Sequence, residues 1–191
     1  MARKKGKPRQ QRQRTLICCE GETEKEYFKM LKTKYRGTQV DIQIKTSKHT
    51  AALNMIQTLI SAPENYERTY VVFDKDENSH SNLEKACKLA KDNNIKVLYS
   101  NDCFELYILL HFEEVRSHLN KKDLYKKLEN WLGVNDYESS KGKKIEELFD
   151  RVHLAEKNCS NFSDDLTKSF NLNPYTNVGK YLKEIFYRDS L

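Results

Sequence analysis

The stretch Thr15-Leu16-Ile17-Cys18-Cys19-Glu20-Gly21-Glu22-Thr23 decides the fold of this chain. Its first five residues form a continuous apolar run, which is typical of a strand buried on both faces of a parallel sheet. Glu20 and Gly21 end the run. An apolar stripe at helical spacing follows, formed by Tyr27, Phe28 and Leu31. The segment therefore predicts a strand, a turn and a helix.

This strand and helix unit repeats along the first part of the chain. Further strands are predicted at residues 40–44, 69–73 and 96–100. Helices are expected after them at residues 52–60, in a segment opened by a capping box of Ser81 with Glu84, and in the apolar run 104–112. Asn101 either caps this last helix or faces a functional site, and capping is the expected role. His111 is expected to pack within the run. Alternation of this kind predicts an α/β fold with a mostly parallel, Rossmann-like sheet flanked by helices.

Beyond residue 113 the pattern is helical, and we expect no strand there. The apolar stripes of this part are Leu124, Leu128, Trp131 and Leu132, then Ile145, Leu148, Phe149 and Val152, and finally Val178, Tyr181, Leu182, Ile185 and Phe186. Amphipathic stripes need a partner surface, so residues 113–191 are expected to form a helical C-terminal portion packed on the core of residues 15–112.

The positive charge of the protein is concentrated in residues 1–14. The chain of 191 residues has a net charge of +6. Residues 1–14 hold seven of the 34 basic residues and no acidic one, which leaves 27 basic against 28 acidic residues in the rest. Such a run is normally disordered, and it is either a nucleic-acid arm that includes Arg12 and Arg14 or a solubilising terminus.

Several protein classes are excluded by composition. No apolar run approaches the ~18 residues of a membrane span, and the N-terminus lacks the apolar core of a secretion signal. The five cysteines include no C-x-x-C pair, which argues against a structural zinc site and fits a reducing compartment. We therefore expect a soluble, cytoplasmic protein that has no membrane partner.

Acidic residues follow two of the predicted strands. Glu20 follows the first apolar run, and Asp74 with Asp76 follows the third. Ligands of open parallel sheets bind at the carboxyl ends of the strands. Either motif alone is more often a polar loop or a helix start, but together they predict carboxylates that converge on one edge. Oxygen ligands at such an edge suit Mg²⁺ or Mn²⁺.

Four motifs, in order along the chain, resemble known families. C-E-G-E-T-E-K-E-Y-F at residues 19–28 and V-F-D-K-D-E at residues 72–77 resemble the TOPRIM domain, a metal-binding fold shared by topoisomerases, bacterial primases and overcoming-lysogenization-defect (OLD) nucleases. S-N-D-C-F-E-L-Y-I-L-L-H-F at residues 100–112 and N-P-Y-T-N-V at residues 173–178 are similar to the RloB family, small proteins found beside restriction-modification and phage-defence loci. The resemblance runs from residue 14 to the C-terminus.

The resemblance implies roles for particular residues. Glu20, Asp74 and Asp76 would be the catalytic metal ligands, and the role of Glu20 as ligand or as general acid/base stays open. Glu24 and Glu105 would be auxiliary acidic positions, although Glu24 also fits a simple helix-start charge. The candidates for contact with substrate phosphate are Lys141, Lys143 and Lys144, in a basic loop, together with the arm residues named above.

The expected function is a Mg²⁺- or Mn²⁺-dependent endonuclease acting on DNA or RNA, including tRNA. Related OLD nucleases carry an ATPase on the same chain, so the resemblance implies an antiphage effector that works with a separately encoded ATPase. The alternative is a non-catalytic sensor or adaptor that binds nucleic acid or nucleotide. A primase-like nucleotidyl transferase is a third and weaker option, because no template-binding zinc module is found. The oligomeric state is not predicted.

Overall fold

The fold is a five-stranded sheet covered by helices on both faces. The computed structural model describes residues 13–35, 40–75, 78–163 and 165–186. The strands lie in the order β2-β1-β3-β4-β5, and the four long strands are parallel. The five strands are β1 (Gln13–Cys19), β2 (Val40–Thr46), β3 (Arg68–Asp74), β4 (Ile95–Asn101) and the short β5 (Tyr175–Thr176). The predicted mostly parallel α/β fold is confirmed.

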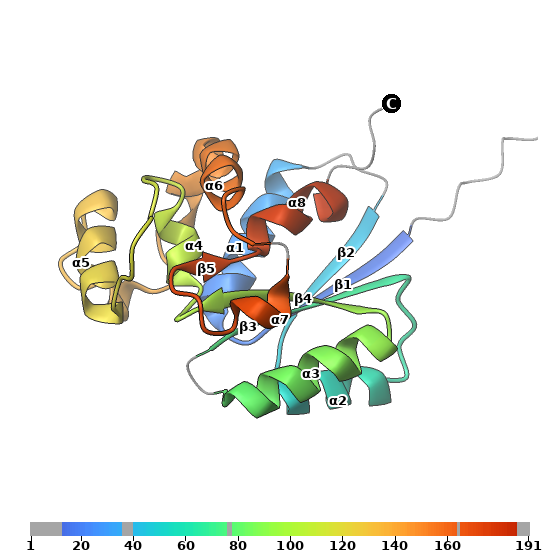
Figure 1. Ribbon diagram of the computed structural model, residues 1–191. Helices are drawn as coiled ribbons and strands as arrows, with labels where there is room; N and C mark the ends of the chain where they lie inside the picture. The colour runs from blue at the N-terminus through green and yellow to red at the C-terminus, as the bar shows by residue number, and fades with distance from the viewer. Residues whose placement is uncertain (1–12, 36–39, 76–77, 164, 187–191) are drawn as a thin grey trace, which may run out of the picture.

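The helices divide between the two faces of the sheet (Figure 1). One face is covered by α2 (Ala52–Ser61) and α3 (His80–Asp92). The other face carries α1 (Glu22–Lys34), α4 (Glu105–Leu109), α6 (Val152–Cys159) and α8 (Val178–Phe186). The remaining elements are α5 (Lys121–Leu132), α7 (Leu166–Ser169) and the 3-10 helices η1 (Glu138–Ser140) and η2 (Ile145–Arg151). Within these described residues, none of the helices has the length and apolar character that a bilayer crossing requires.

The central strands β1, β3 and β4 contribute side chains to the cores on both faces of the sheet, which explains their continuous apolar runs. Because successive side chains of a strand point to opposite faces, alternate residues enter two separate cores. The core under α1 and α8 takes Ile17, Cys19, Tyr70, Val72 and Leu98. The core under α2 and α3 takes Cys18, Val71, Phe73, Val97 and Tyr99. A short sequence can therefore specify a strand without any polar alternation.

The C-terminal portion contains a strand, so the prediction of helices alone was wrong. β5 pairs antiparallel with Ser100 and Asn101 at the end of β4. It has only two residues, which is too short to show a period in the sequence. Asn177 continues this edge with its side chain, because its Oδ1 accepts from the Tyr99 N–H at 2.7 Å and its Nδ2 donates to the Val97 carbonyl at 3.0 Å. The N-P-Y-T-N-V motif thus attaches the C-terminal portion to the sheet.

Three predicted helix boundaries were also wrong. Ser79, rather than Ser81, caps α3 and accepts from the Asn82 N–H at 3.3 Å. The apolar run 104–112 contains only the short α4, followed by turns. Asn101 does not cap that helix, because its Nδ2 instead donates to the carbonyls of Phe170 and Leu172. For Asn101, tertiary partners replaced the local capping that the sequence suggested, whereas α3 is still capped locally, two residues earlier.

Candidate functional site

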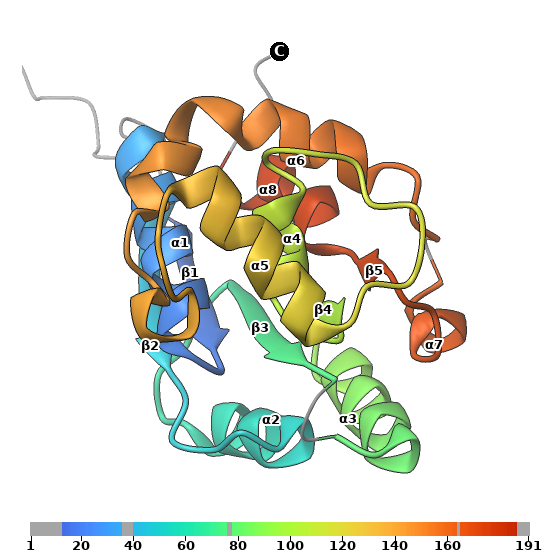
Figure 2. The same cartoon turned by 90° about the vertical axis from the view of Figure 1, so that its left-hand side faces the viewer.

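Carboxylates from three neighbouring strand ends and one helix meet at the carboxyl edge of the sheet, which Figure 2 views with α5 in front. Glu20 follows β1, Asp74 ends β3, and Glu105 opens α4 shortly after β4. Since β1, β3 and β4 are adjacent in the sheet, their ends lie side by side. Glu24 joins them from the first turn of α1. The topology therefore brings together acids that are far apart in sequence.

Glu20 and Asp74 are joined directly. The backbone N–H of Asp74 donates to Oε2 of Glu20 at 3.0 Å. The backbone N–H of Glu20 donates to the Val72 carbonyl at 3.0 Å, which extends the pairing of β1 with β3 by one residue. Glu20 is thus held at the rim by both its backbone and its side chain, and its carboxylate lies beside the last residue of the neighbouring strand.

Asp74 has one satisfied and one unsatisfied carboxylate oxygen. Its Oδ2 accepts from the Phe104 N–H at 3.0 Å. Its Oδ1 is buried, and no hydrogen-bond partner is recorded for it within the described residues. Burial raises the pKa of Asp74 well above its usual value, and the neighbouring carboxylates of Glu24 and Glu105 raise it further. A buried carboxylate oxygen of this kind is stabilised by a cation or a proton.

Glu24 is the second buried acid of the site, at 5% exposure. Burial raises its pKa to about 7, with further repulsion from Glu105 and Glu20 and partial relief from Lys141. Its Oε2 folds back over Gly21, where a Cβ would lie only 2.8 Å away. A larger residue at position 21 would therefore displace the Glu24 carboxylate from this place, and Glu24 has a more specific position than a simple helix-start charge.

Lys141 brings positive charge to the carboxylates. Its Nζ lies 3.7 Å from Oε1 of Glu105, whose residue is 4% exposed. The ammonium also lies 5.0 Å from the centre of the Tyr125 ring, so an aromatic face on α5 helps to position it. Sequence reasoning missed Tyr125, because on the helical pattern it is one more aromatic residue beside the apolar stripe. Its role is visible only once α5 lies across the sheet edge.

The other predicted basic residues lie elsewhere. Lys143 donates to the Ser139 carbonyl at 3.0 Å, and Lys144 donates to the Leu132 carbonyl at 2.7 Å. Arg14 lies near the start of β1, at the opposite end of the strand from the carboxylates, and donates to the Asn65 carbonyl at 3.2 Å. Asp76 and Arg12 lie outside the described residues.

The donor chemistry of this edge fits a hard divalent cation. All four acids offer oxygen, one buried oxygen has no recorded partner, and burial together with mutual repulsion raises the pKa of Asp74 and of Glu24. Among the described residues, however, no three His, Cys, Asp or Glu side chains form a group that could hold a metal ion in their present positions. Asp76, the remaining expected ligand, is not among those residues. The fit therefore rests on the donor set and on the unpartnered oxygen of Asp74.

The raised pKa of Glu24 predicts a pH dependence of stability. Its carboxyl titrates near 4.5 when unperturbed and at about 7 in the folded protein, so between these values the folded state binds more protons. Without metal, the free energy of unfolding should therefore fall as the pH rises from about 4.5 to about 7, by at most roughly 3 kcal/mol. Urea unfolding in the presence of a chelator, repeated at several pH values, measures this decrease in the free energy of unfolding.

The informative quantity is the difference in the free energy of unfolding between the wild type and Glu24→Gln, followed as a function of pH. Burial lowers the pKa of His111 to about 4, and this group contributes the opposite slope, losing stability as the pH falls below 6.5. Subtracting the variant from the wild type removes the histidine contribution. Parallel curves for the two proteins would contradict the prediction.

Comparison with known proteins gives one match. The family model described as RloB-like protein matches residues 15–185. Neither the curated proteins nor the solved structures gave a match. The matched range includes all four carboxylates of the site and the C-terminal motif that holds the edge of β4.

Proposed function

We propose that this chain, which belongs to the RloB-like family, is a metal-dependent nuclease that hydrolyses phosphodiester bonds of nucleic acid. The observation that carries the proposal is the group of acids at one sheet edge, in which a buried oxygen of Asp74 has no recorded partner among the described residues. A structural role would favour paired or exposed acids, because unpaired buried charge destabilises a protein. Retaining such acids is expected where they bind a charged ligand.

Glu20, Asp74 and Asp76 would hold Mg²⁺ or Mn²⁺, with Glu24 and Glu105 as further ligands. When bound, the metal would lower the pKa of a water molecule and neutralise charge on the phosphate. The chain itself supplies proton acceptors at the same place. Glu24, whose pKa is about 7, can exchange a proton near neutral pH. Glu20 lies at the rim, where its carboxylate can act as a ligand or as a general base.

Lys141 would make the first contact with a substrate phosphate. It is an exposed lysine whose ammonium lies at the carboxylates, so it can offset the repulsion between this acidic edge and a phosphate backbone. Lys143, two residues away, adds a second positive charge on the same loop. Binding should therefore weaken steeply as salt is raised. Whether DNA, RNA or tRNA is the substrate is decided by assay.

The cellular setting that we propose is antiphage defence together with a separate ATPase. This part of the proposal is supported by the resemblance to families found at phage-defence loci and to OLD nucleases, which combine the two activities. In such a system the ATPase would control the nuclease. If the isolated protein does not cleave, the assay should be repeated after coexpression with the ATPase encoded beside it.

A second candidate is a nuclease-inactive sensor that binds nucleic acid or nucleotide. The contact of Lys141 with Glu105 favours it, because an internal cation can compensate part of the negative charge without any metal. In that case nucleic acid would bind equally well in chelator and in Mn²⁺, and no product would form. A nuclease requires cleavage that depends on the metal.

The test compares Glu20→Gln with Glu22→Gln on labelled DNA and total tRNA. Glu20 lies at the carboxylates, whereas Glu22, two residues further along the chain, is exposed and pairs with Lys25 at 2.8 Å, so the two variants remove the same charge from neighbouring positions. We expect Mn²⁺-dependent cleavage in the wild type and in Glu22→Gln, and a loss of at least about 100-fold in Glu20→Gln. Equal cleavage by both variants would contradict the proposal.

A further inference from the structure

A cavity opens on the free edge of the sheet, away from the carboxylates. β5 pairs only with Ser100 and Asn101, so the amino-terminal half of β4 is an outer edge. The cavity along this edge has a volume of 610 Å³, within the range of small-molecule sites. In Figure 1 α3 lies on one side of β4 and α8 on the other. Ile95 and Val97 of β4 form part of its wall.

The backbone of β4 offers this cavity a hydrogen-bond acceptor and a donor. Peptide groups of successive residues in a strand point to opposite sides. The Ser100 carbonyl points toward β3, where it accepts from the Lys75 N–H at 3.1 Å. The Val97 carbonyl points the other way, toward the Asn177 side chain. By alternation, the Ile95 carbonyl and the Val97 N–H also point to the outer side, two residues apart along the strand.

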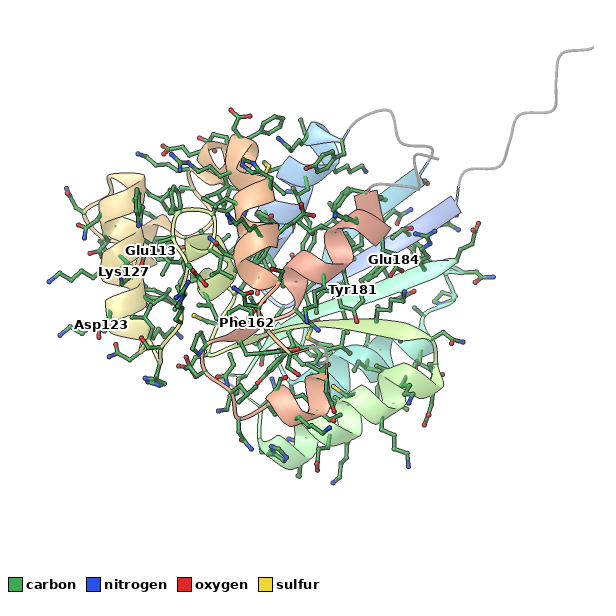
Figure 3. The ribbon with its side chains drawn as sticks, turned by 45° about the horizontal axis from the view of Figure 1, so that its top comes forward. Glu113, Asp123, Lys127, Phe162, Tyr181 and Glu184 are labelled. Carbon is green, nitrogen blue, oxygen red and sulfur yellow. The ribbon has the colours of Figure 1, made fainter. Side chains whose placement is uncertain are left out.

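The walls of the cavity are apolar and include an aromatic ring. Tyr181 lines it from α8, Cys87 from α3 and Leu166 from α7. Figure 3 shows Tyr181 and Glu184 on α8, next to the strands. A flat heterocycle can pack against Tyr181 while its edge faces the β4 backbone. This combination of one aromatic wall and a donor-acceptor pair suits a nucleobase.

The charges around the cavity favour an anion. Lys88 and Lys91 line it from α3 and Lys96 from β4, against the single acid Glu84. Lys96 is paired with Glu184. For Lys88 and Lys91, no ion pair is recorded in the part of the chain that the structure describes. Two lysines one turn apart on α3 are thus available to bind a phosphate group.

We propose that this cavity binds a purine nucleoside phosphate. The base pairs with the Ile95 carbonyl and the Val97 N–H and packs on Tyr181, and the phosphates contact Lys88 and Lys91. An added peptide strand fits less well, because Asn177 already occupies the edge beyond Val97 and leaves a stretch of three residues. Ile95 and Val97 lie three to five residues along β4 from Ser100, the register partner of Asp74, which is roughly 10–17 Å at ~3.3 Å per residue, and the site does not depend on the proposed nuclease activity.

The experiment titrates ATP into the full chain by calorimetry in EDTA, so that no metal binds the carboxylates. The variants are Lys88→Glu combined with Lys91→Glu, and Tyr181→Ala. Lys85→Glu is the control, since this lysine is exposed on the same helix but does not line the cavity. We expect saturable binding that weakens at least about tenfold in the double variant, ~3-fold to tenfold in Tyr181→Ala, and by less than about twofold in the control. Circular dichroism checks that each variant is folded.

Competing ligands identify what the cavity recognises. GTP should bind in the same way as ATP, whereas CTP, UTP and inorganic triphosphate should bind more weakly. Equal competition by triphosphate would show recognition of charge alone, and equal binding of CTP would show that the larger purine ring is not selected; either result would overturn the proposal. The proposal would also be overturned if ATP did not bind, if its affinity did not change in the variants, or if an acidic octapeptide bound and no nucleotide did. Because no step requires Mn²⁺, failure here leaves the nuclease proposal untouched.

Discussion

Asp74→Asn is expected to abolish metal-dependent cleavage and at the same time to stabilise the metal-free protein. The buried carboxylate is destabilised by burial and by Glu24 and Glu105, so replacing it with a neutral amide of the same shape removes that repulsion. At pH 8 in chelator, the free energy of unfolding should rise by about 1–2 kcal/mol. Cleavage in Mn²⁺ should fall by at least about 1,000-fold.

The opposite signs of these two effects separate a ligand-binding role from a structural one. In the wild type, Mn²⁺ should raise the melting temperature, because a ligand that binds only the folded state stabilises it. Asp74→Asn should lose this increase. Asp92→Asn, an exposed acid at the end of α3, is the matched control and should keep both the cleavage and the Mn²⁺ effect. An Asp74→Asn protein that is less stable in chelator and still cleaves would contradict the proposed site.

Asn177→Ala is expected to lower the free energy of unfolding by about 3 kcal/mol. The Asn177 side chain is the partner of the Tyr99 N–H and of the Val97 carbonyl, and the residue is 4% exposed. Alanine would leave both backbone groups without this partner, and each unsatisfied buried group costs about 1–3 kcal/mol. Urea unfolding measures the loss, and hydrogen exchange of the Tyr99 amide locates it.

Two further variants make the Asn177 result specific. Asn177→Asp keeps an oxygen that accepts from Tyr99 but replaces the donor to Val97 with a buried carboxylate oxygen, so it should destabilise the protein at least as much as alanine. Asn171→Ala changes an exposed asparagine of the preceding loop and should alter stability by less than about 0.5 kcal/mol. A loss below about 1 kcal/mol in Asn177→Ala would show that β5 and α8 hold the edge of β4 without it.

The central strands were predictable because burial on both faces gives a signal within five residues. The apolar runs at 15–19 and 69–73 each correspond to a parallel strand, with β1 and β3 extending beyond them by up to two residues. β5 was missed for the opposite reason. It has only two residues, and it forms a strand because it pairs with Ser100 and Asn101 of β4, which lie in another part of the chain.

The candidate site was predictable as a set of acids but not as a geometry. That Glu20 and Asp74 would lie close together follows from the rule that parallel strand ends share one edge, and their hydrogen bond at 3.0 Å agrees with it. Lys141 was predicted as a phosphate-binding residue, but its contact with Glu105 and with the Tyr125 ring could not be foreseen, because both depend on how α5 crosses that edge. Arg14 shows the same limit, since an arginine next to a nucleic-acid arm in the sequence lies at the far end of β1.

The sequence by itself determined the alternation of strands and helices and the identity of the acids at the strand ends, because both are encoded by residues that are close together in the chain. Only the tertiary structure decided which carboxylate oxygen of the described residues is left without a recorded partner, and how the last helices join the sheet. These features depend on contacts between segments 50 or more residues apart, such as that of Glu20 with Asp74 or of Tyr99 with Asn177. No local pattern specifies the distance or the burial on which they rest.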